Sequence, residues 1–332
     1  MIQVRNLTKR YGDKAAISDI CFNVDKGQVV GLLGKNGAGK STTMNILTGY
    51  ISATEGAVAI GGYDIISESA KAKRLIGYMP EQPAFYPEMR TEEHLGFICD
   101  LKGIFKNKKN RAEHILDICE RAFISDVRGR MIKNLSKGYK QRVAFAAAIA
   151  GQPEVIILDE PTAGLDPSQT IEMRKLIVEC AKTSTVIVSS HILTEIQAIC
   201  NRIIVMNEGR IIADDSTENL RRSHDFTNPL KLRIKGSPET VVNVLSSING
   251  VSRVERLPDV EQGAADYAVI TDSEKKDKPY GDIREEIFNE LAANNLPLLA
   301  ASRAGLSLED IFISLTEGTP AQYAIDEEAT LR

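Results

Sequence analysis

One segment restricts the fold of this chain more than any other. The nearly continuous apolar run Gln28–Leu33 leads into a glycine-rich loop, Gly34–Ser41, and the residues up to Thr48 follow a helical pattern that ends at Gly49. A continuous apolar run is typical of a strand buried on both faces, and a glycine commonly follows the last turn of a helix. The segment therefore predicts a strand, a loop and a helix at the centre of an α/β sheet.

The loop itself has the pattern G-x4-G-K-S. Glycines let the backbone amides wrap around phosphate oxygens, while Lys40 supplies charge to the β- and γ-phosphates and the Ser41 hydroxyl is placed to bind Mg²⁺. The start of the following helix adds partial positive charge. This context favours a nucleotide site over the alternative, a glycine-rich turn without a ligand. The expected nucleotide-binding residues are Gly34, Asn36, Gly37, Ala38, Gly39, Lys40, Ser41 and Thr42.

Two adjacent acids, Asp159 and Glu160, directly follow the apolar run Val155–Leu158. Ligands bind at the carboxyl edge of a parallel sheet, where such residues lie. We therefore expect Asp159 to hold Mg²⁺, directly or through water, and Glu160 to polarise the attacking water as general base. The alternative is a strand-ending turn with solvated acids, and the phosphate loop in the same chain favours the catalytic interpretation.

The rest of the first two thirds of the chain fits an α/β architecture. Ile2–Leu7 and Ile17–Val24 alternate like short strands, and the segment from about 91 to 150 has a helical period with breaks near 103–110 and 129–134. Val186–Ser189 is another buried-strand run. Buried strands that alternate with helices predict a parallel sheet.

A second, smaller domain is expected after the polar stretch 221–225, which is suited to a linker. The pattern beyond it is strand, helix, strand, strand, helix, strand, which is typical of a ferredoxin-like α+β domain. A further helix is expected at Leu308–Leu315 and an acidic tail at the end of the chain. The six expected elements are Leu230–Ile234, Pro238–Ile248, Val251–Leu257, Tyr267–Thr271, Ile283–Asn294 and Leu298–Ser302.

Five short segments resemble the motifs of one family, the ATP-binding-cassette (ABC) ATPases. Asn134–Arg142 resembles the signature motif, usually L-S-G-G-Q, and Gln82 resembles the glutamine of the Q-loop. Ala163–Asp166 resembles the D-loop, His191 the switch histidine, and Tyr11 the aromatic residue that stacks on adenine. The resemblance covers residues 1 to about 220, with the motifs in the family order.

The resemblance implies a fold and further site residues. The expected fold is a P-loop NTPase cassette with a RecA-like parallel core, an N-terminal antiparallel β subdomain and a helical subdomain at about 88–150. His191 and Gln82 are implied in catalysis, Gln82 also in binding Mg²⁺, and Tyr11 and Asp166 in binding ATP. Ser136 and Gly138, whose counterparts contact γ-phosphate in the family, are implied in binding ATP as well.

The signature departs from the family pattern, since Lys137 replaces its first glycine and Tyr139 its glutamine. Independently of the resemblance, Ser136 is a good N-cap for a helix over Lys137–Ala150, so a hydroxyl and free amides converge there. The start of this helix is either an anion site, which would bind the ATP held by a second copy of the chain, or a structural cap only. Two incomplete half-sites in one chain favour head-to-tail pairing of two copies, with ATP between them.

The resemblance also implies a function. The chain is expected to be an ATP-hydrolysing subunit, a homodimer that powers transport through a separate transmembrane permease, with ATP and Mg²⁺ as its cofactors. Ser307–Thr316 resembles the closing motif of ATPases that serve ABC-2-type exporters. The expected domains are an ATPase domain at 1–222, an accessory domain at 228–318 and the tail at 319–332.

Two rival functions remain. A soluble ABC ATPase acting on ribosomes or DNA usually has tandem cassettes or long coiled coils, which this chain does not resemble. A regulatory module that binds nucleotide without turnover is disfavoured by the presence of Glu160 and His191.

Composition limits the cellular setting. The formal net charge of −4 shows no basic surplus of the kind that favours nucleic acid as a partner. No apolar run approaches the roughly 18–20 residues that span a bilayer, the first residues lack a secretory signal pattern, and the five cysteines form no C-x-x-C pair. We expect a reduced cytoplasmic chain, peripheral on the inner face of the cell membrane.

Two further patterns are interpreted as structural and not as binding sites. The pairs His94/Cys99 and His114/Cys119 are five residues apart and do not share a helix face, so core packing is preferred over a metal site. The basic cluster of Lys102, Lys106, Lys108, Lys109 and Arg111 is interpreted as a solvated loop, with contact to anionic lipid as the alternative.

Overall fold

The computed structural model describes residues 1–104, 107–224, 230–261, 263–271 and 282–303, together with Phe312 and Thr316. Its contacts divide the chain into two units, Met1–Thr217 and Glu218–Arg332. The first unit contains two sheets and the second contains one, and each unit has a hydrophobic core of its own.

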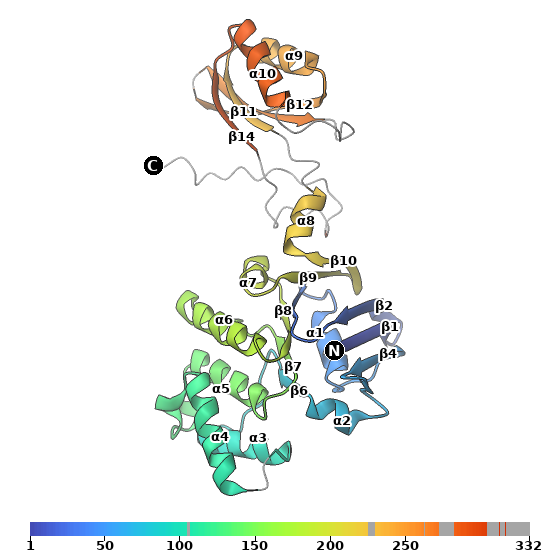
Figure 1. Ribbon diagram of the computed structural model, residues 1–332, viewed down its shortest axis with the longest axis vertical. Helices are drawn as coiled ribbons and strands as arrows, with labels where there is room; N and C mark the ends of the chain where they lie inside the picture. Colours follow the sequence, from blue (N-terminus) through green and yellow to red (C-terminus); the bar gives the residue numbers. More distant parts are fainter. Residues whose placement is uncertain are drawn as a thin grey trace. The chain divides into compact units, whose positions relative to one another are not determined.

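The first unit contains an antiparallel sheet and a larger, mainly parallel sheet (Figure 1). The antiparallel sheet has the order β2 (Lys14–Val24), β1 (Ile2–Tyr11), β4 (Glu55–Ile60), β5 (Tyr63–Asp64). The second sheet has the order β10 (Arg210–Ser216), β9 (Arg202–Asn207), β3 (Val29–Leu33), β8 (Thr185–Ser190), β7 (Val155–Asp159), β6 (Ile76–Met79). All neighbours in this second sheet are parallel except β10 and β9. The predicted parallel core and antiparallel subdomain are therefore confirmed.

A single core joins the two sheets through α1 (Lys40–Leu47). Ile2 and Ile60 of the antiparallel sheet, Met44 of α1, and Leu32 and Ile157 of the parallel sheet are all buried members of it. Figure 1 shows α1 between the two sheets. This burial fixes the start of α1, and with it the glycine-rich loop, against both layers.

Several helix starts follow directly from capping residues in the sequence. Asn107, Ser136, Asp166 and Ser237 each accept a hydrogen bond from a backbone amide two or three residues further on. Besides α1, the described helices of the first unit are α2 (Ser69–Arg74), α3 (Thr91–Leu101), α4 (Lys108–Arg121), α5 (Lys137–Ile149), α6 (Pro167–Ala181) and α7 (Leu193–Gln197), with short 3₁₀ turns at Ser125–Val127 and Ile132–Asn134. The helix α8 (Thr217–His224) begins at the last residue of the first unit and continues into the second.

The predicted helical subdomain corresponds to α3, α4 and α5, which contact one another (Figure 1). His94 and Cys99 are buried in this region, and the His94 ring meets Phe85 edge-on. The position of Lys102 differs from the prediction that it belongs to a solvated loop. Its ammonium donates to the carbonyls of residues 147, 148 and 150 at the end of α5, while Lys106 lies outside the described residues.

The second unit is an antiparallel sheet with two helices packed on one face. Its strand order is β12 (Val251–Glu261), β13 (Ala264–Thr271), β11 (Leu230–Lys235), β14 (Leu298–Arg303), and its helices are α9 (Pro238–Ser247) and α10 (Asp282–Ala293). All neighbouring strands are antiparallel, so the order of elements and the sheet topology are those of a ferredoxin-like fold, as the sequence predicts.

Two predictions near the ends of this unit have different outcomes. The polar stretch interpreted as a linker is helical as far as His224, because it belongs to α8. Glu218, Leu220 and the two arginines of α8 favour a helix, and polarity alone says nothing about backbone conformation. The helix expected at Leu308–Leu315, apart from Phe312, and the acidic tail lie outside the described residues.

Candidate functional site

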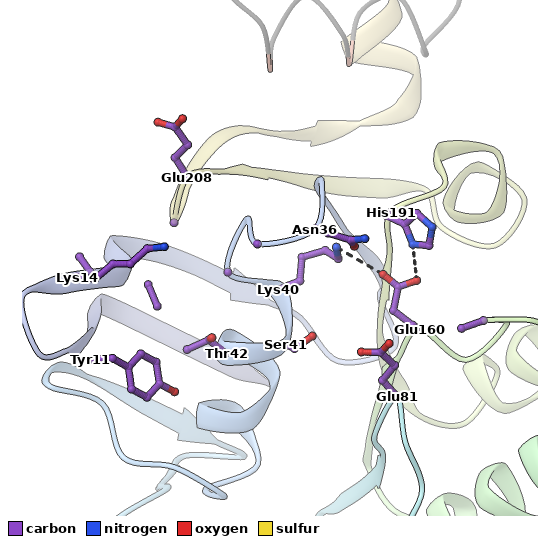
Figure 2. Close-up of a pocket in the computed structure, with 16 residues that line it drawn as sticks. Tyr11, Lys14, Asn36, Lys40, Ser41, Thr42, Glu81, Glu160, His191 and Glu208 are labelled. Carbon is purple, nitrogen blue, oxygen red and sulfur yellow. Dashed lines mark hydrogen bonds and ion pairs between the residues drawn. The ribbon is translucent and has the colours of Figure 1, made fainter.

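A pocket of about 930 Å³ opens between the antiparallel sheet and the carboxyl ends of the parallel strands (Figure 2). Its size and its mixture of amides, hydroxyls and charged groups suit a polar ligand. The residues that line it are Tyr11, Lys14, Ala15, Ala16, Asn36, Gly37, Gly39, Lys40, Ser41, Thr42, Glu81, Glu160, Ala163, His191, Glu208 and Gly209.

The glycine-rich loop forms the floor of this pocket. The loop needs its glycines, because a Cβ on Gly34 would lie 2.5 Å from the Met206 carbonyl oxygen and Gly39 has a φ of 104°. The Lys40 side chain, only 5 % exposed, folds back under the loop and donates a hydrogen bond of 2.7 Å to the Gly34 carbonyl. The loop is therefore preformed around a buried positive charge, which is the arrangement that binds phosphate.

The predicted acid pair stands beside the loop. Asp159 ends β7, and its Oδ1 accepts hydrogen bonds from Ser189 at 2.5 Å and from Ser41 at 3.4 Å. Burial raises the pKa of Asp159, although these two hydroxyls act in the opposite direction. A hydroxyl and a carboxylate that converge in this way are the oxygen donors that Mg²⁺ prefers, so the residues present fit the metal.

Glu160 is held by groups on both sides (Figure 2). Its Oε1 lies 3.5 Å from the Lys40 ammonium and its Oε2 lies 2.9 Å from His191 Nδ1. An ionised carboxylate has no proton to donate, so Nδ1 is the donor and Nε2 is directed elsewhere. Glu160 has a φ of 47°, and its backbone amide donates to the Ser189 hydroxyl. Such backbone strain in a non-glycine residue is typical of functional sites.

The structure brings Glu81, and not Gln82, to the pocket. Both side chains are exposed, but Glu81 is among the residues that line the pocket and Gln82 is not. The segment after β6 has no regular period that would assign a direction to either side chain, so the sequence did not single out Glu81. The role implied for Gln82 in catalysis and in binding Mg²⁺ stays a prediction. A carboxylate at this position is a better Mg²⁺ ligand than an amide.

The signature residues and Asp166 lie outside the pocket. Ser136 caps α5 and accepts from the Tyr139 amide, while Asp166 caps α6. The Tyr139 hydroxyl, in place of the family glutamine, donates to Asp126 at 2.6 Å, and this bond raises the pKa of Tyr139. Ser136, Gly138 and Asp166 are thus exposed or packed on α6 and do not complete the site within one chain.

Other site residues were missed by the sequence interpretation. Ser189 joins Asp159 to the Glu160 backbone, and its position as a hydroxyl at the end of a buried apolar strand was an available signal. Glu208, in the turn between β9 and β10, and Lys14 line the pocket as well, and neither belongs to a recognisable local pattern.

Comparisons with known proteins give a consistent result. The family model described as ABC transporter matches residues 17–163. The linearmycin resistance ATP-binding protein LnrL of Bacillus subtilis (strain 168) is 31 % identical over 327 residues, which cover 96 % of this chain and 99 % of that protein. The bacitracin transport ATP-binding protein BcrA of Bacillus licheniformis is 31 % identical over 96 % of this chain and 98 % of that protein.

Solved structures agree in fold. An ATP-binding subunit of an ABC transporter has a TM-score of 0.62 and 29 % identity, covering 67 % of this chain and 92 % of that one. A dimeric cassette in a post-hydrolysis state with ADP and Pi has a TM-score of 0.60 and 26 % identity, covering 65 % and 98 %. The chain therefore belongs to the ATP-binding proteins of ABC transporters, and it is an ABC ATPase with the cassette fold.

Proposed function

We propose that two copies of this chain bind two MgATP molecules between them, hydrolyse ATP and thereby drive export through a separate transmembrane subunit. The observation that carries this proposal is the split site. Lys40, Glu160 and His191 converge in one pocket, while Ser136 and Gly138, which resemble the γ-phosphate ligands of the family, lie outside it. A second copy that presents its Ser136 end would complete each pocket.

Each residue then has a role in the reaction. Lys40 holds the β- and γ-phosphates, and its approach to phosphate frees the Glu160 carboxylate from the present ion pair. Glu160 accepts a proton from the attacking water, and the His191 ring orients that carboxylate through Nδ1 while Nε2 contacts the γ-phosphate. Tyr11, about half exposed at the pocket wall, is placed to stack on adenine.

Magnesium is part of this proposal. Ser41 and Asp159 supply the ligand oxygens, and Glu81 is positioned to add a carboxylate. When bound, the metal neutralises charge on the β- and γ-phosphate oxygens.

The partner and the location rest on relatives and on composition. LnrL and BcrA are named for antibiotic resistance and transport, which supports an export role. Among the residues that the structure describes, no helix could cross a bilayer. We therefore propose a permease as a separate chain, with this protein cytoplasmic and peripheral on the inner face of the membrane. Co-purification with a polytopic membrane protein supports this assignment, whereas ribosomes or DNA in its place would contradict it.

The central test is Glu160→Gln, which keeps the shape of the side chain and removes the base. We expect steady-state phosphate release to fall about 10²–10⁴-fold. Nucleotide affinity persists, and the variant accumulates as an ATP-dependent dimer, which size-exclusion chromatography with light scattering detects. Turnover equal to that of the unchanged chain would refute the role of Glu160, and an ATP-bound monomer would refute the shared site.

Lys40→Ala is the matched control. It removes the buried ammonium from the same pocket, so we expect loss of nucleotide binding itself in a titration with fluorescent ATP. The two variants therefore separate binding from catalysis.

A further inference from the structure

Lys137 stands where the family signature has a glycine, and its side chain lies against the D-loop of its own chain. A Cβ built on Gly164 would be only 1.8 Å from the Lys137 Nζ and 2.9 Å from its Cε. The end of the lysine side chain therefore fills the space directly above Gly164. Any side chain larger than hydrogen at 164 would displace it.

This contact is steric and not ionic. Lys137 is exposed, and in the described part of the chain no ion pair or side-chain hydrogen bond holds its ammonium. Gly164 has a φ of 69° and offers no side chain. The end of the lysine side chain, Nζ and Cε, thus lies against bare D-loop backbone.

The D-loop turn is connected to Glu160 by backbone hydrogen bonds. The Ala163 amide donates to the Glu160 carbonyl at 3.1 Å, and the Leu165 amide donates to the Thr162 carbonyl at 3.1 Å. Ala163 also lines the nucleotide pocket. A movement of Gly164 would therefore shift the backbone of Glu160, because the hydrogen-bonded turn connects the two residues.

The neighbouring contacts join only helices. Gly138 packs against the Gln169 side chain, and Arg142 pairs with Glu172, so α5 and α6 are braced together. Lys137, by contrast, lies against Gly164 in the loop between β7 and α6.

We infer that Lys137 is a positioning residue that transmits engagement of the signature turn to Glu160 of the same chain, and so couples the two ATP sites of the dimer. The inference rests on the proposed function, because the signature turn of one copy serves the ATP of the other. When the partner's ATP binds at Ser136, Lys137 presses on Gly164 and adjusts the turn that holds Glu160. Each site thereby senses the occupancy of the other.

The experiment is a double-mutant cycle with Lys137→Ala, Gly164→Ala and both together. Gly164→Ala adds backbone strain in both backgrounds, so the strain cancels in the cycle and the steric contact remains. ATPase kcat, KM and Hill coefficient are measured for each variant, with the thermal midpoint as a check on folding. Lys140→Ala is the control, because it removes another lysine from the same helical turn, whereas the three atoms nearest to the Cβ position of Gly164 all belong to Lys137.

We expect Lys137→Ala to lower kcat by roughly 2- to 30-fold and to bring the Hill coefficient toward 1, with the nucleotide affinity of the isolated monomer unchanged. Gly164→Ala should lower kcat more in the chain that keeps Lys137 than in the Lys137→Ala chain. Lys137→Met restores the contact without the charge and returns both parameters toward normal, and Lys140→Ala leaves them unaltered.

An unchanged Hill coefficient and kcat in Lys137→Ala, additive effects in the cycle, or a Lys137→Met variant that behaves like Lys137→Ala would each overturn the inference. Absence of turnover or of ATP-dependent pairing in the unchanged chain would instead overturn the proposed function. The two failures are therefore distinguishable.

Discussion

Glu160 shows how much of this site is decided by single side chains. The carboxylate lies within reach of the Lys40 ammonium and the His191 ring, and its backbone, at positive φ, donates a hydrogen bond to Ser189. Only a position determined by several contacts retains such strain, which is of the order of 1–3 kcal/mol. The carboxylate is thereby fixed where an incoming γ-phosphate would meet it.

The adjacent residues Glu81 and Gln82 give a prediction at the same scale. Because Glu81 lines the pocket and Gln82 does not, Glu81→Ala should raise the Mg²⁺ concentration for half-maximal ATPase activity by roughly 10-fold or more. Gln82→Ala should change it by less than about 2-fold, because Gln82 is not among the residues that line the pocket. Activity measured across a Mg²⁺ titration compares the two variants. The reverse ranking would return the metal role to Gln82.

Among the elements, α5 is stabilised at both ends by groups from the same chain. Ser136 caps its start, and the Lys102 ammonium donates to three carbonyls at its C-terminal end, at 3.4, 3.4 and 3.0 Å. A cation at a helix C-terminus also interacts favourably with the helix dipole. Lys102 follows α3, so the contact holds α3 and α5 together and fixes the helix that carries the signature residues.

The pH dependence of stability tests this contact. Burial lowers the pKa of Lys102 to about 8, from 10.5 in an unstructured chain. Between these values the unfolded chain binds a proton that the folded chain has released, so the Lys102 contribution makes unfolding free energy rise with pH. The slope from one group is at most about 1.4 kcal/mol per pH unit. Lys102→Met should lack this component.

Urea denaturation of both proteins between pH 7.5 and 10.5 measures the difference, with all other titrations common to the two chains. If the difference in unfolding free energy between the two proteins does not change with pH, the ammonium stays charged in the folded protein. Toward pH 7.5 the two plots of unfolding free energy against pH should become parallel.

At the scale of the whole molecule, the two units have separate cores, and every described residue that lines the nucleotide pocket belongs to Met1–Thr217. A ligand stabilises only the cooperative unit that binds it. The second unit, with its ferredoxin-like sheet, should therefore unfold independently of nucleotide.

Calorimetry with MgADP, which is not turned over, provides the test. At 100 times its dissociation constant, MgADP should add about 2.7 kcal/mol to the first unit and raise its midpoint by roughly 5–10 °C. The transition of the second unit should stay in place, and Lys40→Ala should abolish the shift. Equal displacement of both transitions would mean that the units unfold as one.

Much of the molecule was determined by local sequence alone. The phosphate loop and the acids after Val155–Leu158 were predictable because their chemistry is encoded in consecutive residues whose backbone torsions and burial follow from residue type. The second unit was predictable because period-2 and period-3.6 patterns alternate along it in the ferredoxin-like order.

Only the tertiary structure decided which distant groups meet. Ser189 binds Asp159 across two neighbouring strands, Lys102 reaches the end of α5, and Lys137 rests on Gly164. Such contacts join segments separated by some 25 to 50 positions, and no local periodicity encodes them. They arise from the packing of strands and helices around a shared core, which also places Glu81, and not Gln82, along the pocket.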